Sequence, residues 1–329
     1  MRVRSLFVWS MGSAAACAAM ITGQRYRRWK QRLRQRFQTE SCLLETSRGT
    51  VEYQMEGAGP VVLVLHGSPG GYDQGMVWAH LLAPGGSTLL SLSRPGYRRT
   101  PLNSGQAPEA QADLFAATLD ALNVAQVVVI ALSGGGPSAL QLALRSPQRC
   151  RGLLLISPLA YASTEEEVYR SLPPGQRLQR WLFNHLLDWD PALYLLSALS
   201  KRMPQEAQAS AFAAQSSAFI ETLVMNSQHS SGYRNDMQQF ATLPAYPFQD
   251  MVVPTLIVHG TADVDVPFRQ TEALASALPH AQLVAIEGAD HFSTVASERA
   301  LAAIHHFLQS LPSGEALHVR GEKEPMEEE

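Results

Sequence analysis

One stretch of this chain constrains its fold more than any other. Residues 127–132 form an apolar, largely β-branched run that indicates a buried strand, and Ser133 follows it directly. Three glycines and a helix-compatible segment come next. The serine therefore lies at a sharp turn from strand to helix, where only small neighbours fit. This turn usually reads G-x-S-x-G, and Ala131 stands here in place of the first glycine.

A glycine-rich turn without chemistry is the alternative interpretation of these residues. A phosphate-binding loop is disfavoured, because no Lys-Ser or Lys-Thr pair follows the glycines. The rest of the chain decides whether Ser133 is a nucleophile or part of a turn without chemistry. A serine hydroxyl becomes a good nucleophile only when a base takes its proton and an acid orients that base.

Both partners are present, each in a loop after a predicted strand. Residues 254–258 indicate a buried strand and lead to Asp263. Residues 281–286 indicate another strand and lead to His291. Parallel strands bring their carboxyl ends to one edge of a sheet. We therefore expect Ser133, Asp263 and His291 to meet at that edge.

Other polar residues compete for these roles. Asp265 is an alternative acid, while Asp290 directly precedes the histidine, and sequence neighbours seldom meet well enough to orient a ring. His66 and His259 precede glycines at strand ends, which favours a role in holding loops through hydrogen bonds.

A glycine-rich loop forms the other wall of the expected site. It occupies residues 66–71, after an apolar strand at residues 61–65. Acyl transfer needs backbone N–H groups that point at the developing oxyanion. We expect one of these groups from Ser68 and the other from Gly134, the residue after the serine.

Together these pieces resemble the α/β-hydrolase fold proteins, a group that includes proline iminopeptidases, hydrolases of carbon–carbon bonds and small esterases. The resemblance covers about residues 40–311. The motifs that carry it are His66-Gly67-Ser68-Pro69-Gly70, Arg94-Pro95-Gly96-Tyr97, the turn at Ser133, His259-Gly260-Thr261-Ala262-Asp263 and Gly288-Ala289-Asp290-His291-Phe292. The resemblance implies that Ser133 is the nucleophile, His291 the general base and Asp263 the acid that orients it.

The chain departs from this group in the loop after the predicted strand at residues 87–92. That loop often reads Asp-x-Pro-Gly-x-Gly-x-Ser in the group, whereas Arg98 here replaces the second glycine. Serine at position 133 also separates the chain from haloalkane dehalogenases and epoxide hydrolases, which resemble this fold but carry aspartate at the turn.

Strands alternate with helices along most of the chain. This alternation predicts an α/β class, an α/β-hydrolase fold with a mostly parallel central sheet and helices on both faces. The alternation stops in residues 159–247, where no convincing strand is found. We expect an inserted helical cap there, within a core made of residues 39–158 and 248–312. Residues 313–329 read as a disordered acidic tail.

The start of the chain has a different composition. Residues 1–36 carry nine Lys and Arg and no acid, so the remaining residues hold a net charge of −12, which does not favour nucleic-acid binding. Residues 5–23 are uncharged and long enough to span a bilayer. We predict a membrane anchor and basic segment at residues 1–38. The basic side chains after the uncharged stretch predict that the catalytic domain lies on the cytoplasmic side.

Three alternatives for this segment stay open. A cleaved signal peptide would give an exported protein. Cys17 would be the attachment point of a lipoprotein. The segment would otherwise be a helix that rests on the membrane surface by its basic face.

These observations predict a serine hydrolase that cleaves an ester or amide of a small-molecule substrate through an acyl-enzyme. They predict no cofactor, and no metal because ligand spacings such as H-E-x-x-H are missing. A narrower hypothesis is an aminopeptidase similar to the proline iminopeptidases, whose substrate amine needs a carboxylate from the cap. The candidates for that carboxylate are Glu165, Glu166, Glu167, Glu206 and Glu221. The remaining alternative is a binding protein with this fold and no activity.

Overall fold

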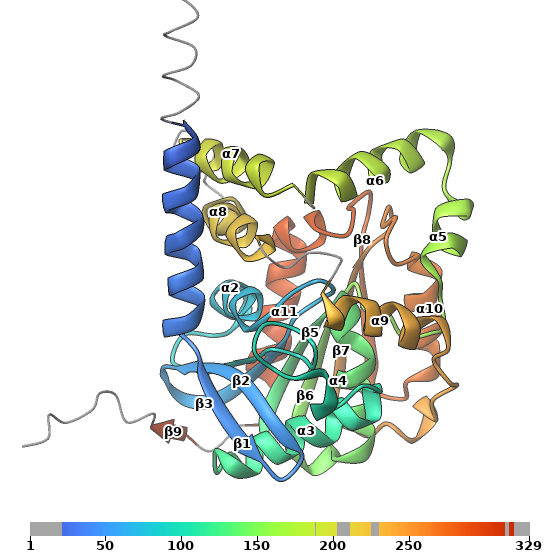
Figure 1. The fold of residues 1–329 in the computed structure, drawn as a ribbon. Helices are drawn as coiled ribbons and strands as arrows, with labels where there is room; N and C mark the ends of the chain where they lie inside the picture. Colours follow the sequence, from blue (N-terminus) through green and yellow to red (C-terminus); the bar gives the residue numbers. More distant parts are fainter. Residues whose placement is uncertain (1–21, 188, 203–210, 225–229, 313–315, 319–329) are drawn as a thin grey trace, which may run out of the picture.

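The computed structural model describes residues 22–187, 189–202, 211–224, 230–312 and 316–318 (Figure 1). Its centre is a twisted sheet. The strands are β1 (Cys42–Thr46), β2 (Gly49–Glu56), β3 (Ala58–Leu65), β4 (Thr88–Leu92), β5 (Val127–Leu132), β6 (Cys150–Ile156), β7 (Thr255–Gly260), β8 (Ala281–Ile286) and β9 (Ala316–His318).

The order of the strands places the six parallel ones side by side. It runs β1-β2-β4-β3-β5-β6-β7-β8, with β9 paired to β3 off this path. The first two strands form an antiparallel hairpin, and β2 pairs antiparallel with β4. From β4 to β8 every pair is parallel, so the carboxyl ends of β3, β5, β7 and β8 share one edge.

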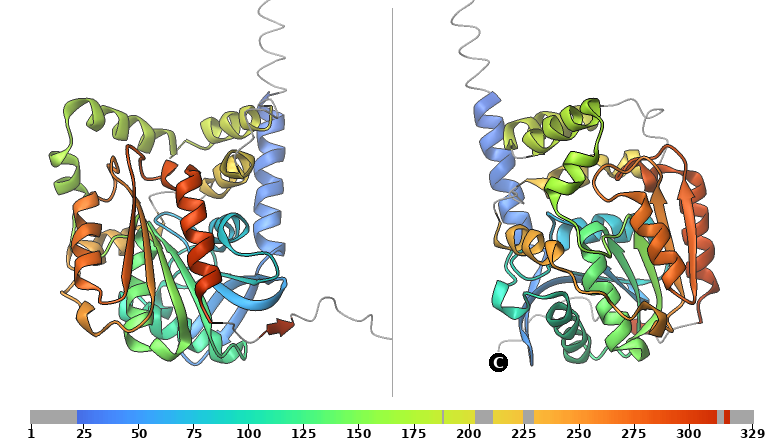
Figure 2. Two further views of the ribbon diagram at one scale, coloured as in Figure 1. Left: turned by 180° about the vertical axis from the view of Figure 1, so that it is seen from behind. Right: turned by 90° about the vertical axis from the view of Figure 1, so that its right-hand side faces the viewer.

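Helices cover both faces of this sheet (Figure 2). They are α2 (Tyr72–Leu82), α3 (Pro108–Ala121), α4 (Gly136–Arg145), α10 (Phe268–Ala277) and α11 (Glu298–Ser310). Successive side chains of a strand point to opposite faces. In β3, Val62 and Val64 pack in the cluster with α2 and α11, whereas Leu63 and Leu65 pack in the cluster with α3, α4 and α10. Burial on both sides explains why the strands are almost continuously apolar.

The cap lies between β6 and β7. Its described helices are α5 (Glu165–Ser171), α6 (Pro174–Leu187), α7 (Asp190–Ser200), α8 (Ala211–Leu223) and α9 (Ser231–Ala241). They lie over the carboxyl edge of the parallel strands, with α6 and α7 at the end of the molecule opposite the β1–β2 hairpin (Figure 1). The predicted fold class, a mostly parallel sheet with helices on both faces and an inserted helical cap, is confirmed.

A helix at residues 22–39 precedes the sheet and packs on the cap. Its buried side chains, Trp29, Leu33 and Phe37, form one apolar cluster with Leu193 of α7 and Val224. Spacing of four residues places the three on one stripe of the helix. The predicted boundary at residue 38 therefore cuts through a packed unit. Sequence analysis missed this apolar stripe because basic residues lie between Trp29, Leu33 and Phe37.

The predicted membrane anchor lies almost wholly outside the described residues, because only residues 22 and 23 of the uncharged stretch belong to them. Among the described residues, no helix combines the length and apolar character that crossing a bilayer requires. Membrane attachment through residues 5–23 stays a prediction.

Part of the predicted disordered tail is a strand. Residues 316–318 pair antiparallel with residues 58–60 at the start of β3. Pairing of β3 with β4 begins only at Val61, and pairing with β5 only at Val62, so the backbone of residues 58–60 is open to another partner. Residues 313–315 and 319–329 lie outside the described residues.

The packing of the first helix predicts a stability effect. Leu33 is 4% exposed, so Leu33→Ala leaves a cavity between this helix and the cap. We expect the free energy of unfolding in urea to fall by about 2–5 kcal/mol. Leu43→Ala is the matched control, because Leu43 is 51% exposed on β1. It is expected to change the free energy by less than about 0.5 kcal/mol. Equal, small effects of both substitutions would show that the helix does not pack on the cap.

Candidate active site

The turn after β5 has the strained geometry that the sequence predicts. Ser133 has φ = +49°, in the left-handed region that side chains other than glycine rarely adopt. It opens a short 3₁₀ turn that leads into α4. The following glycines are required by close packing, because a Cβ at Gly135 would lie 2.8 Å from the carbonyl oxygens of Leu65 and His66.

Asp263 and His291 are in direct contact at the ends of β7 and β8. The Nδ1 of His291 lies 2.6 Å from Oδ2 of Asp263. The other carboxylate oxygen accepts N–H groups from Asp265 at 2.8 Å and Val266 at 2.9 Å, which fix the carboxylate. The carboxylate thereby orients the ring through Nδ1, so Nε2 is the nitrogen left for a proton transfer.

The electrostatics of this pair follow from its burial. Burial disfavours ionised Asp263, but the charge of His291 and a hydrogen bond from His259 outweigh it and hold the pKa of the carboxyl below its usual range. Burial also disfavours the imidazolium of His291. The adjacent Asp263 carboxylate outweighs that effect and raises the pKa of His291 to about 9.

The competing acids have other partners. Asp265 pairs with Arg180 of α6, with 3.3 Å between its Oδ1 and the guanidinium Nε. Asp290 accepts the backbone N–H groups of Phe292 and Ser293 in its own loop. Asp263 is therefore the carboxylate that orients the ring of His291.

His66 and His259, the other two histidines at strand ends, have different roles. His66 Nε2 accepts the backbone N–H of Arg94 at 2.9 Å, and burial together with the charge of Arg94 lowers its pKa well below the usual value. It holds two loops together as a neutral ring. His259 Nε2 lies 2.9 Å from Oδ2 of Asp263, so this histidine supports the acid directly.

A cavity joins these groups to the cap. From the core it is lined by Ser133, His291, Ser68 and Gly134, and from the cap by Glu165, Arg180, Asn184 and Tyr233. Apolar walls come from Trp78, Leu159, Val168, Phe219, Met237 and Phe240. The cavity therefore offers an apolar space with charged groups on the cap side, which suits a small organic substrate.

The two predicted oxyanion residues are neighbours across this cavity wall. A Cβ at Gly134 would lie 2.2 Å from Oγ of Ser68, so the two loops approach each other closely. The glycine is required by this contact. Ser68 and Gly134 thus lie on adjacent segments beside Ser133. That their backbone N–H groups form an oxyanion site stays a prediction.

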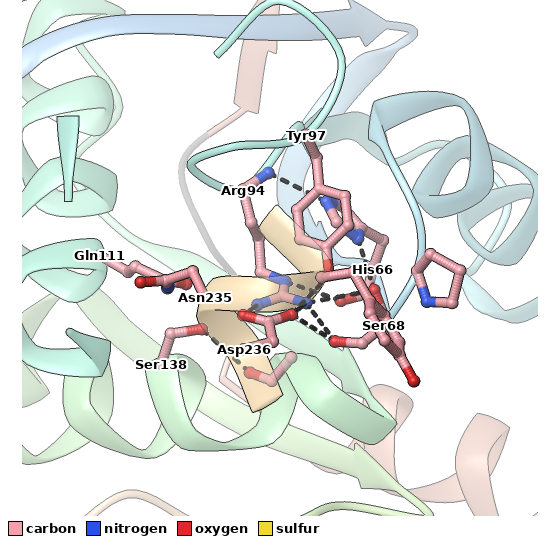
Figure 3. A network of polar contacts seen from close by, with 12 residues as sticks. His66, Ser68, Arg94, Tyr97, Gln111, Ser138, Asn235 and Asp236 are labelled. Atoms are coloured by element: carbon pink, nitrogen blue, oxygen red, sulfur yellow. Dashed lines mark hydrogen bonds and ion pairs between the residues drawn. The ribbon is translucent and has the colours of Figure 1, made fainter. Parts of the chain in front are cut away.

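A buried charge network holds the Ser68 loop (Figure 3). Arg94 donates to both carboxylate oxygens of Asp236 on α9, at 3.0 and 2.7 Å, and to Ser68 Oγ at 2.8 Å. Ser68 also donates to Asp236, and Tyr97 donates to the same carboxylate at 2.7 Å. The network joins the loop after β3, the loop after β4 and the cap helix α9.

Arg98, which replaces a glycine of the related loop motif, has a structural role. Its φ is +48°, in the backbone region that glycine favours, which explains why the related motif has glycine at this position. Its guanidinium pairs with Asp73 at 2.6 Å, donates to the carbonyl of Thr222 at 3.1 Å, and lies 4.1 Å from the ring centre of Phe37. Arg98 therefore ties the loop to α2, to the cap and to the first helix.

Three side chains at the site are close enough to share a metal ion. One ligand atom from each of Asp263, Asp265 and His291 lies within 4.8 Å of the others. The contacts already described engage these groups with one another, with Arg180 and with backbone N–H groups. The absence of a metal or other cofactor stays a prediction.

Comparison with known proteins establishes the family. The family model of the alpha/beta hydrolase fold matches residues 60–295, which include every core residue of the site. The chain belongs to the α/β-hydrolase fold family. The predicted resemblance is therefore confirmed at the level of the family.

Individual relatives point to hydrolysis. An alpha/beta hydrolase fold protein from Nakamurella multipartita has a TM-score of 0.64 and 32% identity, over 82% of this chain and 98% of that one. The uncharacterized hydrolase YcgS of Bacillus subtilis is 28% identical over 65% of this chain and 78% of its own length. A 2-hydroxy-6-oxononadienedioate/2-hydroxy-6-oxononatrienedioate hydrolase of Cupriavidus pinatubonensis is 25% identical over 72% and 82%, respectively. The family and these relatives support a hydrolytic function for the chain.

Several residues of the site were missed by sequence analysis. Asp236 and Tyr233 lie on a cap helix whose sequence carries no recognisable motif, and Arg180 lies on another. Ser157 follows β6 with φ = +45°, lines the cavity, and has no hydrogen-bond partner for its hydroxyl among the described residues. Its place after a buried strand, as at Ser133, was the one available signal.

The buried pair predicts a large effect of removing its acid. Asp236→Ala leaves Arg94, 1% exposed, without a counter-charge, and we expect the free energy of unfolding to fall by about 3–5 kcal/mol. Asp113→Ala is the control, because Asp113 pairs with Arg145 at the surface and its loss costs about 1 kcal/mol or less. A loss of similar size in both variants, measured by urea unfolding, would contradict the network.

The Asp263–His291 contact predicts a shift in titration. In Asp263→Asn the carboxylate that favours the imidazolium is removed while burial remains, so the pKa of His291 falls from about 9 to 6.5 or below. NMR titration of the histidine ring measures this value. Asp265→Asn is the matched control with a smaller decrease, since Asp265 contributes less. An unchanged His291 pKa in Asp263→Asn would refute the contact.

Proposed function

We propose that this chain is a serine hydrolase that cleaves an ester or amide bond of a small substrate through an acyl-enzyme on Ser133. The observation that carries the proposal is the joint presence of Ser133 and His291 on one cavity, with Asp263 in contact with the ring. A strained serine, an oriented imidazole and a buried carboxylate are the components of nucleophilic acyl transfer.

The proposed reaction uses each of these groups in turn. In the neutral form of His291 the ring proton is on Nδ1, toward Asp263, and Nε2 takes the proton of Ser133 Oγ as the oxygen attacks the carbonyl carbon. The N–H groups of Ser68 and Gly134 stabilise the oxyanion. His291 then gives its proton to the departing alcohol or amine. Water attacks the acyl-enzyme by the same route and releases the acid.

The imidazolium formed in this reaction is stabilised by Asp263. The same stabilisation that raises the pKa of His291 keeps the ring protonated at lower pH. Only the neutral ring accepts the serine proton, so activity rises with pH until the ring is deprotonated.

An aminopeptidase similar to the proline iminopeptidases is a second candidate because one cap carboxylate reaches the cavity. Glu165 lines the cavity and accepts a hydrogen bond from Tyr233 at 2.6 Å. The other glutamates considered for this role have different partners or lie outside the described residues. Glu221 is buried against Lys201 and Arg36, and Glu166 is exposed and pairs with Arg170. Glu167 caps α5, and Glu206 lies outside the described residues.

Arg98 and Ala131 depart from the family motifs and are the two features in favour of an inactive binding protein, and both have structural explanations. Arg98 is engaged with Asp73 and the first helix, and its guanidinium serves packing. Ala131 is fully buried in β5 between its strand partners Leu65 and Leu155. Neither residue removes a component of the proposed reaction.

The proposal predicts the behaviour of Ser133→Ala. With 4-nitrophenyl acetate as substrate, kcat/KM is expected to fall by about four to six orders of magnitude, because the nucleophile is lost while the cavity keeps its shape. Ser276→Ala, an exposed serine on α10, is the control and retains full activity. Retained hydrolysis in Ser133→Ala would rule out this nucleophile. No turnover of any ester or anilide by the wild-type chain, with a small ligand still bound, would favour a binding protein.

Glu165 separates the two hydrolytic candidates. If the Glu165 carboxylate holds a substrate amine, Glu165→Gln raises KM for prolyl-4-nitroanilide by about tenfold or more, because one hydrogen bond to a charged group is lost. KM for 4-nitrophenyl acetate, which has no amine, stays within about twofold by the same reasoning. Glu166→Gln is the control for both substrates. A wild-type chain that hydrolyses the ester and leaves the anilide intact would exclude the aminopeptidase.

A further inference from the structure

Helix α6 is amphipathic, and its apolar side faces outward. Leu178, Trp181 and Leu182 are 58%, 49% and 54% exposed. On the opposite side of the same helix, Arg180 and Asn184 line the cavity. A helix on a globular protein normally turns its apolar stripe toward the core and its polar side toward water. Because the apolar side of α6 faces outward, we expect another apolar surface to cover it.

Helix α7 continues this surface. Trp189, Leu195 and Leu199 are 60%, 51% and 61% exposed. Seven of the ten exposed large apolar residues in the described part of the chain lie on or between these two helices. Both helices lie at one end of the molecule (Figure 1). We call this surface the cap face; its members are Leu178, Trp181, Leu182, Trp189, Leu195, Leu196 and Leu199.

Exposed positive charge lies next to the cap face. The first described turns of the N-terminal helix pack beside α7, where the rings of Trp29 and Tyr194 are 5.2 Å apart. Arg25, Arg27 and Arg28 on these turns are exposed. Clustered arginines beside exposed tryptophans suit the boundary of an anionic bilayer, where each cation near the surface contributes about 1 kcal/mol.

The position of the N-terminal helix also places an uncharged segment of the chain next to the cap face. The N-terminal helix begins, at residue 22, at the end of the molecule where α7 lies (Figures 1 and 2). The sequence immediately before it, residues 5–21, has no charged side chain. The uncharged stretch therefore joins the folded body at the edge of the cap face.

We propose that the cap face docks on a lipid bilayer that contains anionic headgroups. The tryptophans and leucines enter the boundary between headgroups and acyl chains, and the arginines of the N-terminal helix contact phosphate. Because Arg180 and Asn184 of α6 line the cavity, the docked bilayer lies about one helix diameter, roughly 10 Å, from the cap wall of that cavity. The proposal concerns a surface and stands whether or not Ser133 is a nucleophile.

The test places a fluorophore on the cap face of the full chain. Cys17, Cys42 and Cys150 are replaced, and a single cysteine at position 182, 199 or 43 carries the environment-sensitive dye NBD. Leu43 is the matched control, because it is an equally exposed leucine on β1, away from the cap. Vesicles of phosphatidylcholine with or without phosphatidylglycerol are added, and binding is followed in parallel by co-sedimentation.

Docking predicts a severalfold, blue-shifted rise of emission at positions 182 and 199 with the anionic vesicles, and no change at position 43. Binding to vesicles with no change at any of the three positions would mean that the N-terminal segment alone tethers the chain. A change that follows protein concentration without vesicles would assign the face to a second copy, and failure to bind vesicles would exclude a bilayer. Each of these results overturns the proposal.

A second measurement avoids the cysteine replacements. In the otherwise native chain, Leu182→Gln together with Leu199→Gln is expected to weaken binding to anionic vesicles by about tenfold or more, because two immersed side chains become polar. Leu43→Gln leaves binding unchanged. Hydrolysis of 4-nitrophenyl acetate in the absence of vesicles is unchanged in both variants, which separates loss of docking from loss of the site. Equal binding of all three chains would refute the proposal.

Discussion

The parallel arrangement of the central strands is the constraint on which the site depends. Because β3, β5, β7 and β8 run in the same direction, their carboxyl ends deliver the loops of Ser68, Ser133, Asp263 and His291 to one edge. Backbone pairing and two buried faces fix the register of these strands. The candidate site thus depends on a sheet that apolar packing holds between two layers of helices.

A second layer of organisation comes from buried charges. Arg94 and Asp236 join the loops of the core to the cap helix α9. Arg98 and Asp73 join the next turn of the same loop to α2, against the first helix. Such pairs add little net stability over apolar packing, but the loss of one partner leaves the other charge buried and unpaired. They join the cap and the Ser68 loop to the part of the core that carries Ser133.

The features that the sequence predicted are local ones. The strand before Ser133, the glycines after it, and the acid and histidine after later strands each follow from a pattern of a few residues. The partners of Arg94 were beyond such reasoning, because Asp236 is 142 residues away on a cap helix. The packing of the first helix and of β9 was missed for the same reason, since each depends on a surface made by distant segments.

Ser133, activated by His291, is the proposed reactive group. Its most direct test is peptide mapping by mass spectrometry after reaction of the native chain with a fluorophosphonate. We expect one phosphonyl adduct, on Ser133, and much slower labelling of the same residue in His291→Ala. An adduct on another serine such as Ser157, or labelling of Ser133 at an equal rate without His291, would contradict it.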